Sequence, residues 1–167
     1  FYQQYPSFSD RVVTFYNRIA EEVVKELPDA RLGAYAYSSY REAPLGVSLH
    51  PSIVIGFVGL DYFNEETRQV DLKRWDAWTH KAHSLFLRPN AILRMDGLPA
   101  IYVTRLAEDI RHCYQTGMTV ADFDSLSGHW STVGLNYYVL AKLLWDPAAD
   151  EQAIVRDYCE KGFGKAA

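Results

Sequence analysis

The stretch that decides the fold is GMTVADFDSLSGHWSTVGLNYYVLAKLLWDP, which runs from Gly117 to Pro147. A short apolar run ends in two acids, Asp122 and Asp124, and a polar and aromatic loop follows with His129 and Trp130. In α/β barrels the chemistry sits in the loops that leave the carboxyl ends of parallel strands. The stretch therefore predicts the functional edge of such a barrel.

Apolar runs of strand length alternate with helical periodicity along the rest of the chain. Val12, Phe15 and Ile19, for example, recur at spacings of three and four, as on one face of a helix. We expect strands at 32–37, 52–59, 84–87 and 118–121, and helices at 9–27, 71–82, 99–116, 134–145 and 150–161. This alternation favours parallel βαβ units over a β-sandwich.

Capping residues and apolar stripes refine these helices. The residues placed to cap helical patterns are Ser7, Asp71 and Asp150. The first helix is expected to bury an apolar stripe between Phe8 and Leu27, and the helix at 134–145 is apolar nearly all round, which predicts deep burial. Segment 38–51 carries two prolines and no helical period, so the first unit is expected to lack its helix.

The connecting loops are of two lengths. Loops that lead into the expected strands are very short, whereas the loops that leave them are much longer, which indicates a barrel with its site on the strand-exit face. A complete eight-stranded barrel takes about 250 residues, and this chain has 167 and opens without Met. The sequence therefore predicts an α/β fold, a single partial domain over residues 1–167 that forms the C-terminal half of a TIM (β/α)8 barrel. Its expected partner is the missing N-terminal half.

The strand-exit loops combine carboxylates, aromatic rings and hydrogen-bonding groups. They contain Tyr37, Tyr40, Arg41 and His50, then Asp61, Tyr62, Phe63 and Asn64, then Arg88 and Asn90, and last Asp122, Asp124, His129 and Trp130. Aromatic rings cover the C–H faces of a sugar, and the polar groups bind its hydroxyls, so this set suits a carbohydrate. Glycoside hydrolysis also needs two carboxyls, roughly 5 to 5.5 Å apart for retention or 6.5 to 9.5 Å for inversion.

Each of these residues also has a structural interpretation. Asp122 and Asp124 share a side of their strand if it continues that far, and they either line a substrate pocket or cap a loop and accept hydrogen bonds from Arg88. Asp61 has the same two interpretations. Arg88 is a substrate clamp or the charge partner of an acid. Trp130 either stacks on a ligand or packs.

Other kinds of site and partner find little support. His80 and His83 have a spacing that metal sites use, but no third ligand matches, so no metal site is predicted. The chain has no GxSxG elbow, no GxGxxG and no Walker pattern, and we expect no cofactor. Cys113 and Cys159 are core thiols or one disulfide. A net charge of -4 without long single-sign runs argues against nucleic acid, and no apolar run is long enough to span a membrane.

The C-terminal sequence GHWSTVGLNYYVLAKLLWDPAADEQAIVRDYCEKGFGKAA, with FYNRIAEEVVKELPDARLGAYAY upstream, resembles a bacterial family of unknown function with a glycoside-hydrolase-like barrel. The family's pattern is a strand-end acid, here Asp122 or Asp124, then W...GLNYYV.AKL.WDP and an FG.AA ending. The resemblance implies a (β/α)8 barrel similar to α-glucuronidase and hexosaminidase barrels, a carbohydrate substrate, and a secreted or periplasmic protein. Many relatives carry Glu at the strand end, and a shorter Asp changes the reach to a glycosidic oxygen.

Together these observations predict a glycoside-hydrolase-like domain that acts on or binds a poly- or oligosaccharide. In this hypothesis Asp122 or Asp124 orients or activates the substrate, and the general acid comes from the missing half. The residues expected to bind the substrate are Tyr37, Asp61, Tyr62, Arg88, Asn90, His129 and Trp130. The alternative is a catalytically silent carbohydrate-binding or structural half-barrel.

Overall fold

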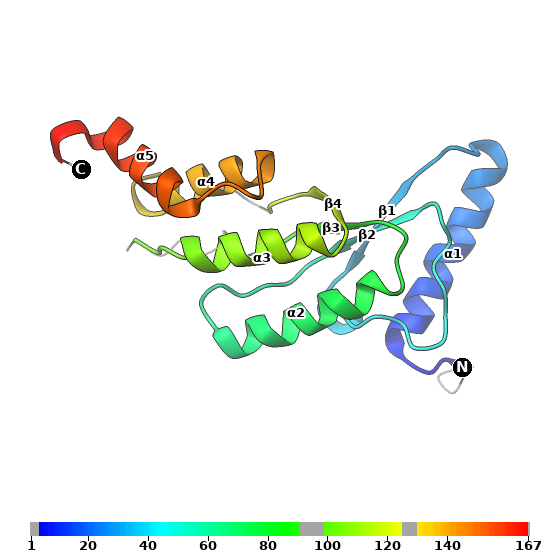
Figure 1. Cartoon of the computed structure of the whole chain (residues 1–167). Helices are drawn as coiled ribbons and strands as arrows, with labels where there is room; N and C mark the ends of the chain where they lie inside the picture. The colour runs from blue at the N-terminus through cyan, green and yellow to red at the C-terminus, as the bar shows by residue number, and fades with distance from the viewer. Residues whose placement is uncertain (1–3, 91–98, 125–129, 167) are drawn as a thin grey trace.

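The computed structural model of the chain describes residues 4–90, 99–124 and 130–166. Within these residues it is an α/β fold with a four-stranded sheet and five α-helices (Figure 1). The strands are β1 (Leu32–Ala36), β2 (Ile53–Phe57), β3 (Leu85–Leu87) and β4 (Met118–Ala121). The helices are α1 (Phe8–Glu26), α2 (Glu65–Thr79), α3 (Val103–Gln115), α4 (Trp130–Trp145) and α5 (Glu151–Phe163), with short 3-10 turns η2 (Ser38–Tyr40) and η4 (Gly164–Ala166).

All neighbouring strands of the sheet run parallel, in the order β1-β2-β3-β4. Each strand therefore lies beside the strand that follows it along the chain, as in one half of an α/β barrel. The predicted fold class and all four predicted strands are confirmed, with ends shifted by one or two residues. No described helix is long and apolar enough to cross a membrane.

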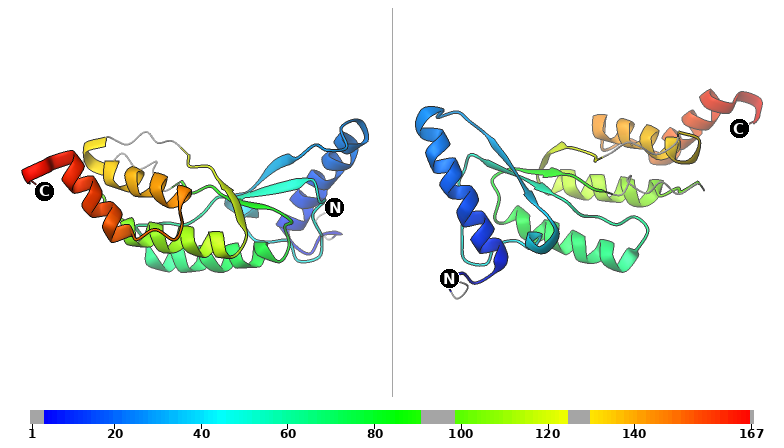
Figure 2. Two further views of the ribbon diagram at one scale, coloured as in Figure 1. Left: turned by 45° about the horizontal axis from the view of Figure 1, so that its top comes forward. Right: turned by 180° about the vertical axis from the view of Figure 1, so that it is seen from behind.

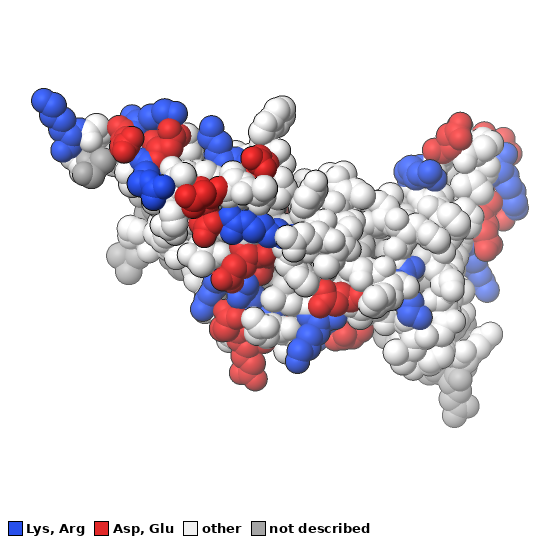
Figure 3. Space-filling view, in the orientation of Figure 1, with Lys and Arg blue, Asp and Glu red and all other residues white. Residues whose placement is uncertain are grey.

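One face of the sheet packs against α2 and α3. Side chains on a strand alternate between the two faces, and Ile55, Phe57 and Leu87 on this face are fully buried. Phe57 meets Trp75 of α2 edge to face, with ring centroids 6.0 Å apart. Figure 3 shows charged side chains gathered over the helices, while the middle of that view, where the strands converge, carries few of them.

The opposite face of the sheet carries a row of apolar residues that no described helix covers (Figure 2). Tyr35, Gly56, Phe86 and Val120 are partners in register across the four strands. The rings of Tyr35 and Phe86 meet over Gly56, where an added Cβ would lie 2.2 Å from Phe86 Cζ. In a closed barrel this face would line the interior.

The helix caps agree with the sequence at two of three places. Ser7 accepts from the Asp10 N–H and Asp150 from the Gln152 N–H, as predicted. The prediction that Asp71 caps the second helix is wrong, because α2 begins at Glu65 with Asn64 as its cap. The extra turns of α2 are mostly charged and polar, so they carry no apolar periodicity that would reveal them.

The apolar stripe predicted for α1 is largely exposed. Phe15 is 60% exposed and Leu27 63% exposed, whereas the polar residue Asp10 is fully buried. Asp10 accepts hydrogen bonds from the N–H groups of Leu45, Gly46 and Val47 at 2.7 to 3.1 Å. These bonds turn the polar side of α1 toward the loop between β1 and β2, which holds no α-helix, as predicted.

The helix α4, at the end of the molecule opposite α1, also exposes apolar surface. α4 begins one turn earlier than predicted, and its Val139 and Leu143 are buried against the core. Deep burial of the whole helix is not observed, because Trp145 is 91% exposed. The two cysteines are free thiols, with Cys113 buried and Cys159 partly buried, so the disulfide alternative is wrong.

Candidate functional site

The carboxyl ends of β3 and β4 bring Arg88 and Asp122 side by side. The sheet hydrogen bonding continues one residue past each strand: the Arg88 N–H donates to Phe57 O at 2.9 Å, and the Asp122 N–H donates to Leu87 O at 2.8 Å. Both residues are therefore held by backbone bonds at the strand-exit edge. This is the edge on which the sequence predicts a site.

Arg88 is the centre of a cluster of predicted site residues. Its guanidinium donates to Asn90 Oδ1 at 2.9 Å, pairs with Asp124 through Nη2 at 3.0 Å, and lies 3.5 Å from Asp122 through Nε. Its Cζ lies 5.0 Å from the centroid of the Tyr35 ring. We call Tyr35, Arg88, Asn90, Asp122 and Asp124 the Arg88 cluster. Arg88 is thus the charge partner of both acids, one of the two interpretations that the sequence allows.

The side chains of the Arg88 cluster are buried to different degrees. The Arg88 side chain is only 18% exposed, whereas that of Asp122 is 55% exposed. Burial acts to lower the pKa of the Arg88 guanidinium, but its hydrogen bond with Asp124 and the charges around it raise that pKa overall. The cluster holds two carboxylates and one guanidinium, so its net negative charge suits a neutral or cationic ligand better than an anion.

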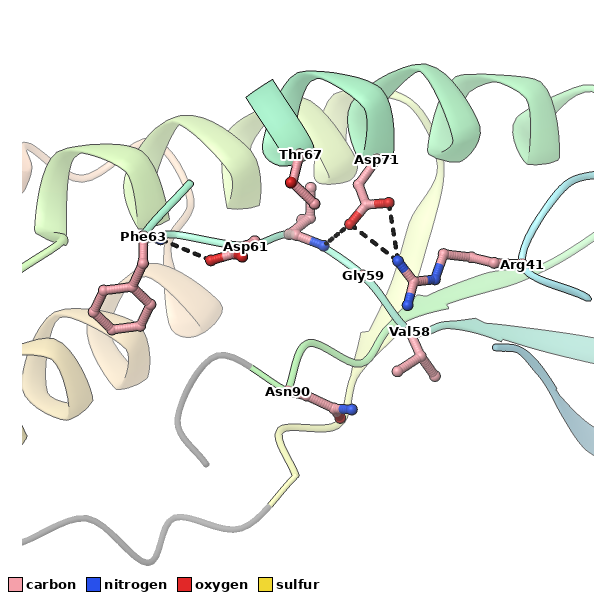
Figure 4. Close-up of a pocket in the computed structure, with 9 residues that line it drawn as sticks. Arg41, Val58, Gly59, Asp61, Phe63, Thr67, Asp71 and Asn90 are labelled. Carbon is pink, nitrogen blue, oxygen red and sulfur yellow. Dashed lines mark hydrogen bonds and ion pairs between the residues drawn. The ribbon is translucent and has the colours of Figure 1, made fainter. Parts of the chain in front are cut away.

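A pocket of about 280 Å³ opens beside the cluster and shares Asn90 with it (Figure 4). Its wall includes Arg41, Asp61, Thr67 and Asp71. Asp61 Oδ1 accepts from the Phe63 and Asn64 N–H groups at 2.9 and 3.3 Å. Asp61 therefore caps its own loop and also lines the pocket.

Asp71 is a residue of this pocket that sequence reasoning placed in another role. Its side chain is 2% exposed and pairs with Arg41 at 3.2 Å and Arg74 at 2.9 Å. It also accepts from the Leu60 N–H at 2.9 Å. Leu60 has a φ of 70°, a conformation that costs free energy for a leucine and is common beside functional sites. Asp71 thus fixes a strained turn in the pocket wall.

Other predicted residues lie away from the cluster. Tyr62 is 1% exposed and stacks on Tyr102 with centroids 4.9 Å apart, so its position does not suit the predicted role of stacking on a ligand. Tyr37 is exposed beside η2 and does not line the pocket. His50 bonds Ser52 at the start of β2, which is the strand-entry side, because the loop passes back below the sheet before β2 begins.

The last two predicted residues come from the loop after β4. Trp130 opens α4, and its ring contacts Tyr137 and Tyr158 instead of the pocket. His129 lies outside the described residues. Among the described residues no group of three or more His, Cys, Asp or Glu side chains could hold a metal ion.

The fold and the site define an α/β protein with half a barrel of parallel strands, an arginine–carboxylate cluster and a polar pocket at its strand-exit edge. The chain belongs to the family described as Domain of unknown function (DUF4838), whose model matches residues 2–167. The predicted membership of a family of unknown function is thereby confirmed. No curated protein and no solved structure matches the chain.

Proposed function

We propose that this domain is glycoside-hydrolase-like and binds a poly- or oligosaccharide at its strand-exit edge. The observation that carries the proposal is the convergence of Asn90, Asp122 and Asp124 on Arg88 beside the Tyr35 ring. Four of these five residues follow the carboxyl ends of β3 and β4, which a barrel directs toward a common centre, and the fifth, Tyr35, lies within β1.

The chemistry of the cluster suits a neutral sugar. Carboxylate oxygens accept hydrogen bonds from hydroxyl groups, and the Asn90 amide can donate and accept. The partly exposed Tyr35 ring offers a face for the C–H groups of a pyranose. Because Arg88 holds both acids in place before any ligand arrives, little side-chain entropy is lost on binding.

A hydrolytic role is the stronger form of this proposal, and it assigns the reacting carboxylate to Asp122. Asp122 is the more exposed acid and has the longer contact with Arg88. In this form Asp124 and Asn90 hold the sugar, and the general acid is supplied by another part of the barrel.

A catalytically silent sugar-binding domain is the second candidate. It is favoured by the sharing of one arginine between Asp122 and Asp124, and by the use of Asp61 as a backbone cap. In both candidates the four strands form half of an eight-stranded barrel of a bacterial protein that acts in the periplasm or outside the cell, as the family resemblance implies. The exposed apolar row on the sheet supports this proposal, because the other half of a closed barrel would cover it.

The experiment is a screen of the purified protein against soluble glycans, with sugar binding and reducing-end release measured together. Asp122→Asn and Asp124→Asn are each expected to weaken binding about tenfold, the loss of roughly one charged hydrogen bond. If the protein is a hydrolase, Asp122→Asn lowers the rate by about a hundredfold or more. Asp29→Asn, an exposed acid before β1, is the matched control. Unchanged binding and turnover in both site variants would refute the proposal.

A further inference from the structure

A second hollow lies between α4 and α5, away from the Arg88 cluster. It encloses about 760 Å³, and its lining includes Trp130, Tyr138, Tyr158 and Phe163 together with Ser131 and Lys161. We call it the aromatic groove. It has no lining residue in common with the pocket that contains Asp61 and Asn90. Figure 1 shows α4 and α5 side by side at the end of the molecule opposite α1.

The four rings of the aromatic groove form one connected set. Tyr158 is at its centre, with ring centroids 6.3 Å from Trp130, 5.4 Å from Tyr138 and 6.0 Å from Phe163. Trp130 and Phe163 at the two ends remain more than half exposed. Contacts between rings restrict their rotation, so an exposed and ordered aromatic surface is present before any ligand binds.

The orientation of Trp130 is set by a glycine one turn along α4. A Cβ added at Gly134 would lie 2.7 Å from Trp130 Cδ2 and 2.8 Å from Cε2, so the indole face rests on the helix backbone. Any larger residue at position 134 would displace the ring. The close contact therefore leaves the opposite indole face directed away from α4.

Polar groups border the rings, and contacts among these groups and with the Tyr138 ring hold them in place. The Tyr138 hydroxyl donates to Asp157, and Asp157 also pairs with Lys161 at 2.6 Å. Lys142 Nζ lies 5.4 Å from the Tyr138 ring centroid. The groove thus presents flat apolar surfaces next to hydroxyl, carboxylate and ammonium groups whose positions are already determined.

We infer that the aromatic groove is a second carbohydrate-binding site that takes a neutral oligosaccharide. Its volume lies in the range of about 300 to 1,000 Å³ typical of small-ligand sites. A sugar pairs its C–H faces with the rings, and its hydroxyls use the donor and acceptor capacity that the bordering hydroxyl, carboxylate and ammonium groups retain beside their own contacts. An apolar helix would use none of that capacity. This inference shares the ligand class of the proposed function and rests on different residues.

The test is calorimetric titration of the purified protein with neutral hexasaccharides of β-1,4-linked glucose, β-1,4-linked xylose and α-1,4-linked glucose. Trp130→Ala and Gly134→Ala are each expected to weaken binding by about tenfold, the loss of one aromatic contact surface. Trp145→Ala removes an exposed tryptophan of the same helix outside the groove. Gly33→Ala, in β1 and outside the groove, adds a Cβ that meets nothing within 4 Å. Both controls should bind within about twofold of the unmodified protein.

The outcomes separate the two sites. Loss of binding in Trp130→Ala with retention in Asp124→Asn supports the aromatic groove and counts against the Arg88 cluster. Loss in Asp124→Asn with full retention in Trp130→Ala overturns the inference and leaves the proposed function standing. The inference is also overturned if Trp130→Ala changes only the sedimentation of the protein, which marks a protein-binding surface, or if no hexasaccharide binds the unmodified protein.

Discussion

Arg88, which is partly buried, and Asp71, which is buried, show two ways in which a single charge organises the strand-exit edge. Arg88 is a cation held between acids that follow β4, and Asp71 is an anion held between Arg41 and Arg74. A buried charge that loses its partners is strongly destabilising. Both residues therefore connect the shape of the edge to the stability of the fold.

We expect Asp71→Asn to lower the free energy of unfolding by about 2 to 3 kcal/mol. The loss is smaller than for a fully enclosed pair, because Arg41 and Arg74 are partly exposed. Asp76→Asn, on the same helix with a half-exposed carboxyl, should cost at most about 1 kcal/mol. Urea unfolding followed by circular dichroism measures both. Equal losses in the two variants would contradict the role given to Asp71.

Part of this site could be predicted from the sequence, and the rest could not, for a physical reason. Asp122, Arg88 and Asn90 could be predicted because each follows an apolar run, and parallel strands end at one edge. Asp71 and Tyr62 could not, since their environments depend on packing between α2, α3 and the loops. In the local sequence, a buried Asp that pairs with two arginines cannot be told apart from an Asp that caps a helix.

At the scale of elements, the uncovered row on the sheet depends on Gly56. An added Cβ there would lie 2.2 Å from Phe86 Cζ and 2.8 Å from Tyr35 Cδ1. Gly56→Ala is expected to lower the free energy of unfolding by about 1 to 3 kcal/mol, because both rings must move. Gly33→Ala is the matched control, since its Cβ would meet nothing within 4 Å. Thermal unfolding compares them. A Gly56→Ala protein as stable as the control would show that the rings rearrange freely.

The stability of the junction between α1 and the loop that joins β1 to β2 is expected to depend on pH. Burial acts to raise the pKa of Asp10, but hydrogen bonds from Ser7 and the N–H groups of 45–47 lower it overall, below its ordinary value of 3.8. The unfolded chain therefore takes up this proton at higher pH than the folded protein. The stabilising contribution of Asp10 is complete above its ordinary pKa and is lost as the pH falls through the lower folded pKa.

Asp10→Asn should accordingly lower the free energy of unfolding by about 1.5 to 3 kcal/mol near neutral pH. The difference from the unmodified protein should shrink as the pH falls below 3.8 and through the lower folded pKa of Asp10, because protonation removes the charge that the N–H groups stabilise. Urea unfolding over a pH series measures this, with Asp29→Asn as the control. A difference that stays constant with pH would mean that the charge of Asp10 is irrelevant.

The helices also show what periodicity can predict. The spacing of apolar residues located α1 correctly, yet the buried side of α1 is set by Asp10 and its bonds to the loop, which no periodicity reveals. α4 was predicted to be buried all round, and Trp145 is exposed. The exposed stripe of α1 lies near β1, an edge strand of the sheet, whereas α4 packs on α3 and α5.

At the scale of the whole molecule, these exposed stripes predict association. We expect the purified protein to self-associate with rising concentration, because Phe15 of α1 and the C-cap residue Leu27 are exposed near β1, an edge strand of the sheet. The double variant Phe15→Ser, Leu27→Ser should shift the equilibrium toward monomer by about tenfold or more. Analytical ultracentrifugation measures the shift.

The control for this experiment changes two exposed acids of the same helix, at Glu21→Gln and Glu26→Gln. It should associate like the unmodified protein. A protein that stays monomeric at all concentrations, with or without the α1 changes, would show that these stripes are not contact surfaces. Stability should change little in either variant, because the altered side chains are already exposed.

The hydrogen bonds that the loop before β2 donates to Asp10 also bear on the order of folding. β1 and β2 are joined by a loop without an α-helix, and that loop takes its shape from a carboxylate on α1. We therefore expect the two strands to pair most readily after α1 has formed and bound the loop. All of these parts are complete by Phe57. During synthesis this unit can assemble before Arg88, Asn90, Asp122 and Asp124 have left the ribosome.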